Sequence, residues 1–487
     1  MSNTWTLRDW LSPWLSVADE RAIGRPSLDS RQLRDGDVFL ACQGGNGHGS
    51  DYLNSAIRAG ASAVLWEPAE GIDGRWLEAC CARAGVAAVA VDDLAAKAGE
   101  LAARYYGEPA CSLTLIGVTG TDGKTSVSQF IARALDGAVI GTLGWGWPDE
   151  LAPGELTTPD AVTLQAWLAE LRDRGAEVVA MEVSSHALAQ SRVAALSFDV
   201  AVLTNLGHDH LDYHGSLEAY RAAKRRLFEL GAPVPVLNLD DEWGAVLASE
   251  LAARAPVGYA MTARAARVRC LEFRPEADTM RLEAAVDGRT VTLSLPLVGR
   301  FNGANVLATA AALTALGVPG DALADRLHRI RPVPGRMEPV TRGEGPAVIV
   351  DYAHTPGALA CALAAAREHC GGELWVVFGC GGNRDPAKRA LMGSIAEREA
   401  DRVVLTNDNP RYEDPRQIID DIRTGMNGDC VVVTDRKAAI CHAIGSAKAT
   451  DCVLIAGKGH ESWQDHGGHR NHFSDREEAS AALEEVV

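Results

Sequence analysis

The chain alternates short apolar runs with longer segments that carry apolar residues at helical spacing, and this alternation predicts an α/β fold. In the first hundred residues the pattern indicates a small N-terminal α/β domain over residues 1–108. The expected strands are 38–42, 61–66 and 86–91, and the expected helices are 52–59 and 94–106. Gly107 and Pro109 mark a linker at 107–111.

Between residues 109 and 334 the apolar runs become more continuous, as in parallel strands that are covered on both faces. Such strands are expected at 113–118, 178–183 and 200–204. A polar, strand-like insert at about 256–298 precedes a helix that carries Asn302 and Asn305. This part of the chain is expected to form a central parallel-sheet domain.

Residues 335–487 repeat the alternation of strands and helices, which predicts a C-terminal, Rossmann-like, doubly wound domain. Its strands are expected at 348–350, 374–378, 402–406, 430–433 and 452–456.

Polar clusters follow the carboxyl ends of these strands in both larger domains. In the central domain they lie at 119–125, 182–186 and 205–214, and in the last domain at 351–354, 379–384, 408–411 and 457–461. In open α/β sheets that edge is the ligand crevice. Two such edges predict a site that is shared by two domains.

The segment 117–126, GVTGTDGKTS, predicts a phosphate-binding loop. It follows a buried strand and ends in Gly-Lys-Thr, so backbone N–H groups and the Lys124 ammonium can hold phosphate while the Thr125 hydroxyl faces Mg²⁺. The glycines stand three apart, at 117, 120 and 123, and thus depart from the usual spacing of nucleotide-binding loops. The alternative is a chance match, which the flanking strand and helix patterns disfavour.

Composition narrows the class of protein. A length of 487 residues corresponds to about three domains. The net charge of −18 argues against nucleic acid or an anionic membrane as the main partner. The eleven cysteines show no C-x-x-C pair, which is typical of reduced thiols in a cytosolic protein. We expect neither a signal peptide nor a membrane span.

Glu182 and the segment 205–214 place a carboxylate and three histidines at the same edge as the phosphate loop. Mg²⁺ prefers oxygen ligands and phosphate, so Glu182 and His210 are candidate metal ligands. The alternative for each is an ordinary polar residue in a solvated loop.

Lys224 lies on the apolar stripe of a helix that Ser216 is expected to cap. The ordinary interpretation is a lysine whose ammonium reaches solvent. If the side chain is instead desolvated near other cations, its pKa falls and the free amine becomes a nucleophile. Such an amine can take up CO₂ as a carbamate.

A set of motifs resembles the Mur ligases of bacterial cell-wall synthesis, and among them the MurE type. These are TGTDGKT, MEVSSHAL, TNLGHDHLDYHGS with AAK, GRFNGANVLAT, DYAHTP, FGCGGNRDPAKR, DNPR and GKGHE. They occur in the family's order over most of the chain, with the weakest match in residues 1–28 and about 240–295.

The resemblance implies an ATP-dependent amide ligase with three α/β domains. ATP phosphorylates the D-Glu side-chain carboxylate of UDP-MurNAc-L-Ala-D-Glu, and an amine then displaces phosphate from the acyl phosphate. The cofactors implied are two Mg²⁺ ions and a CO₂-derived carbamate (N6-carboxylysine) on Lys224. The implied partners are small molecules only, and the implied state is a cytoplasmic monomer.

The resemblance also assigns residues to each ligand. For ATP these are Gly120, Thr121, Asp122, Gly123, Lys124, Thr125, Ser126, Asn305, Arg336 and Asp351. For the UDP-muramoyl-dipeptide they are Ser30, Thr157, Thr158, Ser184, Gln190 and Arg192. The implied metal ligands are Thr125, Glu182, His210 and carbamylated Lys224, and the implied catalytic residues are Lys124, Glu182, His210 and Lys224.

The DNPR motif at 408–411 resembles that of ligases which add meso-diaminopimelate. Arg411 can bind the distal carboxylate of that amino acid bidentately, whereas the ammonium of L-lysine would meet it as a like charge. The residues implied for diaminopimelate are Arg384, Asp408, Asn409, Arg411, Gly457 and Glu461.

Three departures from the family pattern concern local contacts: Asp122, Leu156 and the pair Gly207-His208. The competing hypotheses are another amide ligase on this scaffold, of the MurF, MurC or folylpolyglutamate type, and a regulatory protein that binds ATP without ligation. DYAHTP, DNPR and GKGHE argue against the first, and Glu182, His210 and Lys224 argue against the second.

Overall fold

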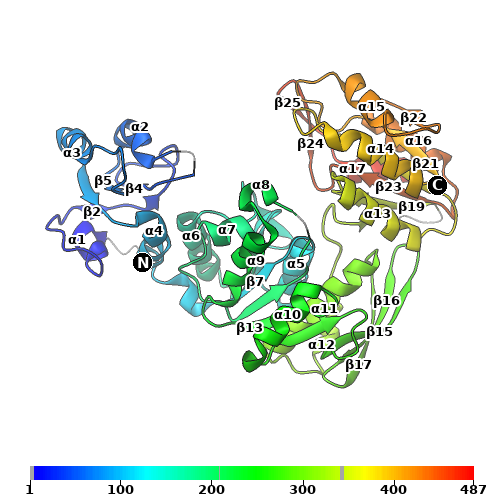
Figure 1. Ribbon diagram of the computed structural model, residues 1–487, viewed down its shortest axis with the longest axis horizontal. Helices are drawn as coiled ribbons and strands as arrows, with labels where there is room; N and C mark the ends of the chain where they lie inside the picture. The colour runs from blue at the N-terminus through cyan, green and yellow to red at the C-terminus, as the bar shows by residue number, and fades with distance from the viewer. Residues whose placement is uncertain (1–4, 46, 208, 341–344, 487) are drawn as a thin grey trace. The chain divides into compact units, whose positions relative to one another are not determined.

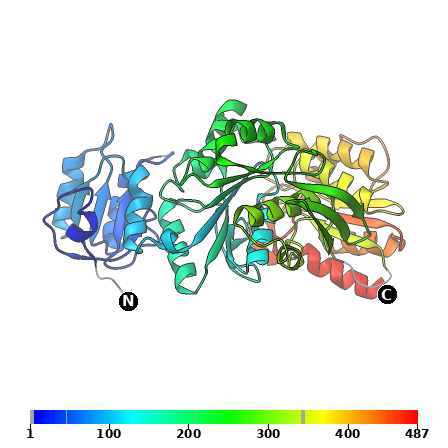
Figure 2. The ribbon, with the colours of Figure 1, turned by 90° about the horizontal axis from the view of Figure 1, so that it is seen from below.

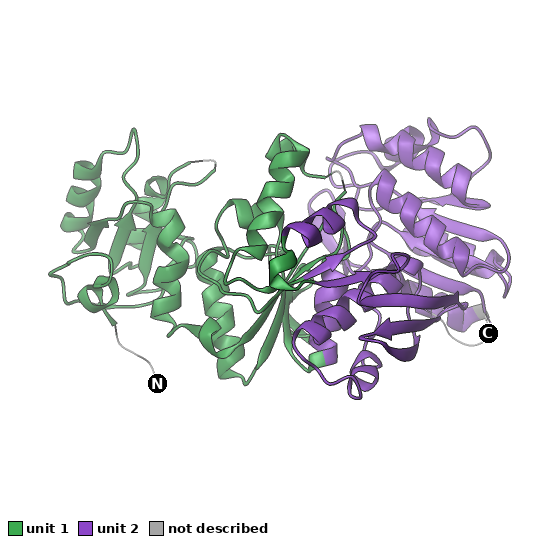
Figure 3. Cartoon of the chain, turned by 60° about the horizontal axis from the view of Figure 1, so that its bottom comes forward, with its two compact units in different colours: residues 1–124, 135–235, 251–256 green, residues 125–134, 236–250, 257–487 purple. Residues whose placement is uncertain are grey.

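The computed structural model describes residues 5–45, 47–207, 209–340 and 345–486 (Figure 1). The chain divides into two compact units (Figure 3). Unit 1 comprises residues 1–124, 135–235 and 251–256, and unit 2 comprises 125–134, 236–250 and 257–487. Each unit is described by itself.

Unit 1 begins with the expected small α/β domain. Its parallel sheet has the order β3-β4-β5-β6, with β3 Pro26–Ser27, β4 Val38–Ala41, β5 Ala63–Trp66 and β6 Ala87–Ala90. Its helices are α1 Leu7–Leu11, α2 Leu53–Arg58, α3 Gly74–Arg83 and α4 Leu94–Tyr105, and β1 Trp5–Thr6 pairs with β2 Ala22–Ile23. Neighbouring residues of β4 pack into different cores, Val38 with Leu40 and Phe39 with Ala41, because successive side chains point to opposite faces.

The rest of unit 1 contains the buried strands that the apolar runs predicted. They are β7 Thr114–Thr119, β8 Ala138–Gly141, β11 Val178–Glu182 and β12 Val200–Leu203, parallel in the order β8-β11-β7-β12. An antiparallel edge adds β9 Gly144–Trp147 and β10 Glu150–Ala152. The helices are α6 Ala161–Asp173, α7 Ser185–Ala189, α8 Leu211–His214 and α9 Leu217–Arg225.

In unit 2 the strand order is β13-β14-β15-β16-β17. These strands are β13 Val234–Asn238, which starts at the end of unit 1, β14 Val257–Ala260, β15 Val268–Pro275, β16 Met280–Val286 and β17 Arg289–Leu295. The last four confirm the strand-like insert. The accompanying helices are α5 Lys124–Leu135, α10 Glu242–Glu250, α11 Arg300–Ala315 and α12 Leu323–Leu327.

The C-terminal part of unit 2 is a doubly wound domain, as expected. Its six-stranded sheet has the order β18-β19-β23-β20-β21-β22, and only β18 is antiparallel to its neighbour. The strands are β18 Glu338–Pro339, β19 Ala347–Asp351, β20 Leu374–Phe378, β21 Arg402–Leu405, β22 Val431–Val432 and β23 Cys452–Ala456. The hairpin β24 Trp463–His466 and β25 His469–His472 follows.

Helices cover both faces of this sheet. They are α13 Pro356–Glu368, α14 Ala387–Glu399, α15 Pro415–Arg423, α16 Arg436–Ser446 and α17 Asp475–Val486. Leu454 of β23 packs in the core with α13 to α15, and its neighbour Ile455 packs in the core with α16 and α17. Figure 2 shows the yellow helices and the red C-terminal helix on opposite sides of this domain. None of the described helices is long and apolar enough to cross a membrane.

Candidate active site

The phosphate loop lies between β7 and α5, and it is tied to the end of β12. The Asp122 N–H donates to Asn205 Oδ1 at 3.0 Å, and the Thr204 hydroxyl donates to the Asp122 carbonyl at 2.5 Å. Gly120 has a φ of 154°, and a Cβ built there would lie 1.7 Å from Thr204 Oγ1. Only glycine therefore lets the loop pack this closely on the neighbouring strand end.

Lys124 closes on the loop itself, since its Nζ donates to the carbonyls of Gly120 and Thr121 at 2.9 and 2.8 Å. Thr121 and Gly123 belong to the same turn, and the Thr121 hydroxyl lies 3.1 Å from Tyr220 Oη. Lys124 begins α5, and Thr125 and Ser126 follow in its buried first turn. A helix N-terminus behind a glycine turn is suited to bind phosphate.

Lys224 is fully buried on α9, and Ser216 caps that helix as the sequence predicted. Its Nζ donates to the Gly120 carbonyl at 2.7 Å and lies 4.4 Å from the centre of the Tyr220 ring. Burial, with a smaller contribution from the Lys124 cation, holds the pKa of Lys224 well below its ordinary value. The free amine is thereby favoured at the back of the phosphate loop.

Glu182 is buried at the end of β11, where Gly141 leaves room for it: a Cβ there would lie 2.2 Å from Glu182 Oε1. Oε1 accepts the Thr142 N–H at 2.8 Å, and Oε2 accepts the Thr142 hydroxyl at 3.1 Å. The carboxylate is thus oriented by Thr142 before any ligand arrives.

His210 has a left-handed backbone with φ 54°, and its ring lies 4.8 Å from that of His186. The donor set of Glu182 and His210, with a carbamate on Lys224, fits a hard cation. Over the described ranges, however, no group of three or more His, Cys, Asp or Glu side chains is close enough to hold a metal ion. The four metal ligands therefore stay a prediction, and His208 of the departing pair Gly207-His208 lies outside the described residues.

A cavity of about 690 Å³ in unit 1 lies between the small domain and α6 to α7. Gln190 and Arg192 line it, and the Arg192 guanidinium donates to Gln190 Oε1 and the Thr158 carbonyl at 3.0 and 2.8 Å. Among the other residues predicted for the UDP-muramoyl-dipeptide, Ser30 is buried outside this lining. Thr157, Thr158 and Ser184 instead hydrogen-bond around Thr142 and Glu182.

The remaining ATP residues belong to unit 2. Asn305 lies on α11 and donates to Asn302 Oδ1 at 3.0 Å. Asp351 ends β19 and accepts the N–H groups of Met337 and Ala353, both at 2.8 Å. The Arg336 guanidinium stacks 4.9 Å from the centre of the Tyr352 ring. Burial raises the pKa of Asp351, and the Arg336 cation opposes that rise.

Four of the residues predicted for diaminopimelate meet at the carboxyl ends of β21 and β23. Asn409 Nδ2 donates to Glu461 Oε2 at 2.8 Å, and a Cβ at Gly457 would lie 2.7 Å from Asp408 Oδ2. Arg411 has a φ of 51° and donates from Nη1 to the Gly382 carbonyl at 2.7 Å. Arg384 is exposed beyond this group. We call residues 407–411 and 456–461 the amino-acid rim.

Comparison with known proteins decides the family. The Mur ligase middle domain matches residues 118–313, the Mur ligase glutamate ligase domain matches 335–459, and the Mur ligase family catalytic domain matches 26–106. The chain belongs to the Mur ligase family. The resemblance read from the motifs is thereby confirmed.

Curated relatives of this Mur ligase match along nearly its whole length. UDP-N-acetylmuramoyl-L-alanyl-D-glutamate–2,6-diaminopimelate ligase of Alkalilimnicola ehrlichii is 52% identical, over 98% of this chain and 99% of the relative. The Pseudomonas aeruginosa protein of that name is 47% identical, over 94% of each chain. A solved structure of a ligase with this name superposes with a TM-score of 0.73 at 33% identity, covering 99% of each chain.

The fold class is confirmed as well. MurF from Thermotoga maritima superposes with a TM-score of 0.64 at 19% identity, over 95% of this chain and 97% of that chain, which shows the shared fold alone. The division at residues 108 and 334 stays a prediction.

Sequence reasoning missed several residues of this Mur ligase. The cavity is also lined by His48, Tyr52 and Asp93, and the glycine-rich stretch after the strand at 38–42 was a signal for the first two. At the amino-acid rim the missed residues are Lys458 and Arg436, both buried. A lysine inside GKGHE and an arginine at a helix start gave no sign of burial.

Proposed function

We infer that this chain is an ATP-dependent ligase that joins meso-2,6-diaminopimelate to the D-Glu side-chain carboxylate of UDP-MurNAc-L-Ala-D-Glu, in peptidoglycan precursor synthesis. The observation that carries the inference is the 52% identity, over 98% of the chain, to a ligase named for these substrates. The phosphate loop and the amino-acid rim supply the two binding functions that such a reaction needs.

The D-Glu carboxylate must be activated before it can form an amide, because a carboxylate is a poor acyl donor. Transfer of the ATP γ-phosphate to a carboxylate oxygen gives an acyl phosphate and ADP. Attack by the amine of diaminopimelate forms the C–N bond through a tetrahedral intermediate; the amine loses a proton and phosphate leaves. Positioning and charge neutralisation provide most of the catalysis in phosphoryl transfer.

We assign the phosphates to the loop, with Lys124 turning from the carbonyls of Gly120 and Thr121 to the β- and γ-phosphates. Mg²⁺, when bound, neutralises phosphate charge, and Thr125, Glu182 and His210 would hold it. Thr142 orients the Glu182 carboxylate for that role.

Lys224 is proposed to carry a carbamate. Its free amine adds to CO₂, forming an N–C bond and releasing one proton, so a buried cation becomes an anionic oxygen ligand. Support comes from its burial and from its lowered pKa.

For diaminopimelate we propose Arg411 as the group that binds the distal carboxylate, with Asn409 and Glu461 beside it. The cavity with Gln190 and Arg192 is proposed for the UDP-muramoyl-dipeptide. We further propose that the protein acts in the cytoplasm as a monomer, where its eleven cysteines, all free, remain reduced.

A panel of amino acids at fixed ATP and muramoyl dipeptide tests the function through phosphate release. Release should require both the dipeptide and meso-diaminopimelate, and L-lysine should support little. Equal turnover with L-lysine would overturn the acceptor assignment, and phosphate release without any amino acid would overturn ligation.

A further inference from the structure

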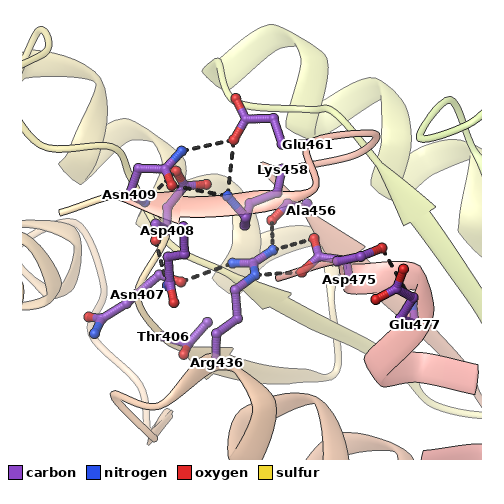
Figure 4. Close-up of polar contacts among 12 residues, drawn as sticks. Thr406, Asn407, Asp408, Asn409, Arg436, Ala456, Lys458, Glu461, Asp475 and Glu477 are labelled. Carbon is purple, nitrogen blue, oxygen red and sulfur yellow. Dashed lines mark hydrogen bonds and ion pairs between the residues drawn. The ribbon is translucent and has the colours of Figure 1, made fainter. Parts of the chain in front are cut away.

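Two buried cations contact the amino-acid rim, Lys458 within it and Arg436 beside it. The side chains of Lys458 and Arg436 are both 0% exposed. Burying a charge costs free energy unless each of its hydrogen-bonding groups is paired. The hydrogen-bond partners of these two residues therefore indicate their role. Figure 4 shows Lys458 with Asn409 and Glu461, and Arg436 with Asn407, Ala456 and Asp475.

The Lys458 ammonium donates all its hydrogen bonds to residues in or next to the rim. Its Nζ donates to Asn409 Oδ1 at 3.0 Å, Glu461 Oε2 at 3.0 Å and the Trp463 carbonyl at 2.6 Å. Three acceptors match the three N–H groups of an ammonium, so Lys458 has no proton left for a ligand.

These bonds determine how the Asn409 amide is oriented. Its Oδ1 accepts from Lys458 and from the Asp465 N–H, both at 3.0 Å, so its Nδ2 must face Glu461 Oε2, at 2.8 Å. The same Oε2 thus receives two donors, which fixes the plane of the Glu461 carboxylate. Lys458 sets the direction of two side chains that are proposed to face the amino acid.

Arg436 holds the backbone of the rim. Its Nε and Nη2 donate to Asp475 Oδ1 and Oδ2, both at 2.7 Å. Its Nη1 donates to the Asn407 carbonyl at 3.1 Å, and Nη2 donates to the Ala456 carbonyl at 2.9 Å. These two carbonyls immediately precede Asp408 and Gly457.

The position of these carbonyls in the sheet explains the need for Arg436. Strand β20 separates β21 from β23, so no ladder hydrogen bond can join the ends of β21 and β23. The Arg436 guanidinium bridges them, and its charge is balanced by Asp475 at the start of α17. Arg436 therefore links the backbones of the two halves of the rim, whose side chains are linked by Lys458 and Asn409.

We propose that Lys458 and Arg436 are positioning residues for the acceptor amino acid, Lys458 through the side chains of Asn409 and Glu461, and Arg436 through the backbone at 407 and 456. The proposal rests on the function proposed above. Apolar side chains of similar volume fill a core at no net loss of stability in many proteins, so buried ion pairs are weak evidence for stability. The contacts of Lys458 and Arg436 to the rim indicate a role in positioning the amino acid rather than in stability.

The experiment uses the full chain and the variants Lys458→Met and Lys458→Gln, together with the double variant Arg436→Met/Asp475→Met. The KM for meso-diaminopimelate is measured at saturating ATP and muramoyl dipeptide, the KM for ATP is measured separately, and thermal unfolding is followed. Asp451→Asn is the matched control: Asp451 is buried at the opposite end of β23 and accepts the N–H groups of Glu373 and Lys448, both at 2.9 Å.

Lys458→Met and the double variant should raise the KM for meso-diaminopimelate about tenfold or more, with the KM for ATP within about twofold of wild type. Lys458→Gln, which keeps an amide donor, should give a smaller rise in this KM and is the milder substitution for folding. Asp451→Asn should lower the unfolding temperature without changing the KM for the amino acid.

Folded variants with an unchanged KM for the amino acid would overturn the proposal, as would an equal rise in Asp451→Asn. Failure of all three rim variants to fold would overturn it too, because the cations would then serve the fold. If the wild-type protein releases no phosphate in response to meso-diaminopimelate, the proposed function fails instead.

Discussion

At the scale of single residues, the proposed chemistry depends on a group whose environment changes its protonation. That group is Lys224, because burial and Lys124 favour its free amine. Lys224→Ala should lower kcat/KM by about two orders of magnitude or more, with partial recovery in formate or acetate, since a small carboxylate can replace the oxygens of the proposed carbamate. Steady-state phosphate release with and without the added anion measures both effects.

Arg225→Ala is the matched control for that substitution. Arg225 is the next residue on α9, and its side chain is 41% exposed in an ion pair with Glu229. Its variant should keep wild-type activity. Full activity of Lys224→Ala, or a defect that no carboxylate relieves, would contradict the carbamate.

His460 gives a second prediction, on stability against pH. Burial and the Arg336 cation lower the pKa of His460 to about 4, below its ordinary value of 6.5. The unfolded chain therefore binds more protons between these values, so His460 contributes stability that is present above pH 6.5 and is lost as the pH falls toward 4. The full effect is about 3 kcal/mol at about 1.4 kcal/mol per pKa unit.

His460→Gln should reduce the fall in unfolding temperature between pH 6.5 and 4. Glutamine does not titrate, so the folded and unfolded states no longer differ in the protons that they bind at this position. His469→Gln, at an exposed position in β25, is the control and should leave the slope unchanged. An unaltered slope in His460→Gln would show that other groups cause the acid sensitivity.

At the scale of elements, the phosphate loop depends on a glycine. Gly120→Ala would bring a Cβ to 1.7 Å from Thr204 Oγ1, so loop and strand end must separate. We expect weaker ATP binding and a loss of stability of about 1–3 kcal/mol. Nucleotide titration and chemical unfolding measure the two.

Gly357→Ala in α13 is the contrasting substitution. A Cβ there meets nothing within 4 Å among the described atoms, and the position is helical. This change should keep ATP binding and leave stability equal or higher by about 0.5–1 kcal/mol. If Gly120→Ala behaves like Gly357→Ala, the packing argument is wrong.

The elements also show which parts of the fold the sequence pattern predicts. Buried runs identified β7, β11 and β12 within a residue or two, since a strand covered on both faces is apolar throughout. The hairpin β24–β25 was missed because β25, His469–His472, is exposed and polar. The two buried cations Lys458 and Arg436 were missed for a different reason: their partners Asn409 and Asp475 lie 49 and 39 positions away, and a local sequence pattern does not show such pairing.

At the scale of the whole molecule, the two cores of the C-terminal domain draw their described residues from that domain, except for Val298 in the core under α13 to α15. The core under α16 and α17 draws all its residues from Val340 to Leu483. We expect residues 335–487, expressed alone, to fold and unfold cooperatively, because both faces of the sheet stay covered. Circular dichroism during thermal unfolding is the measurement, and a broad transition would contradict the boundary near residue 334.

The hydrogen bonds that hold the backbone of the amino-acid rim affect how the substrate specificity of this enzyme can change in evolution. Carbonyl groups at Asn407, Asp408 and Arg411 are held by Arg436, Gln464 and Gly467. Substitution of the Arg411 side chain, which is proposed to face the ligand, therefore leaves these backbone bonds in place, whereas Asn409 and Glu461 also pair the buried Lys458 ammonium. We expect a change of the preferred amine acceptor to begin at Arg411, where a point mutation leaves a folded enzyme on which selection can act.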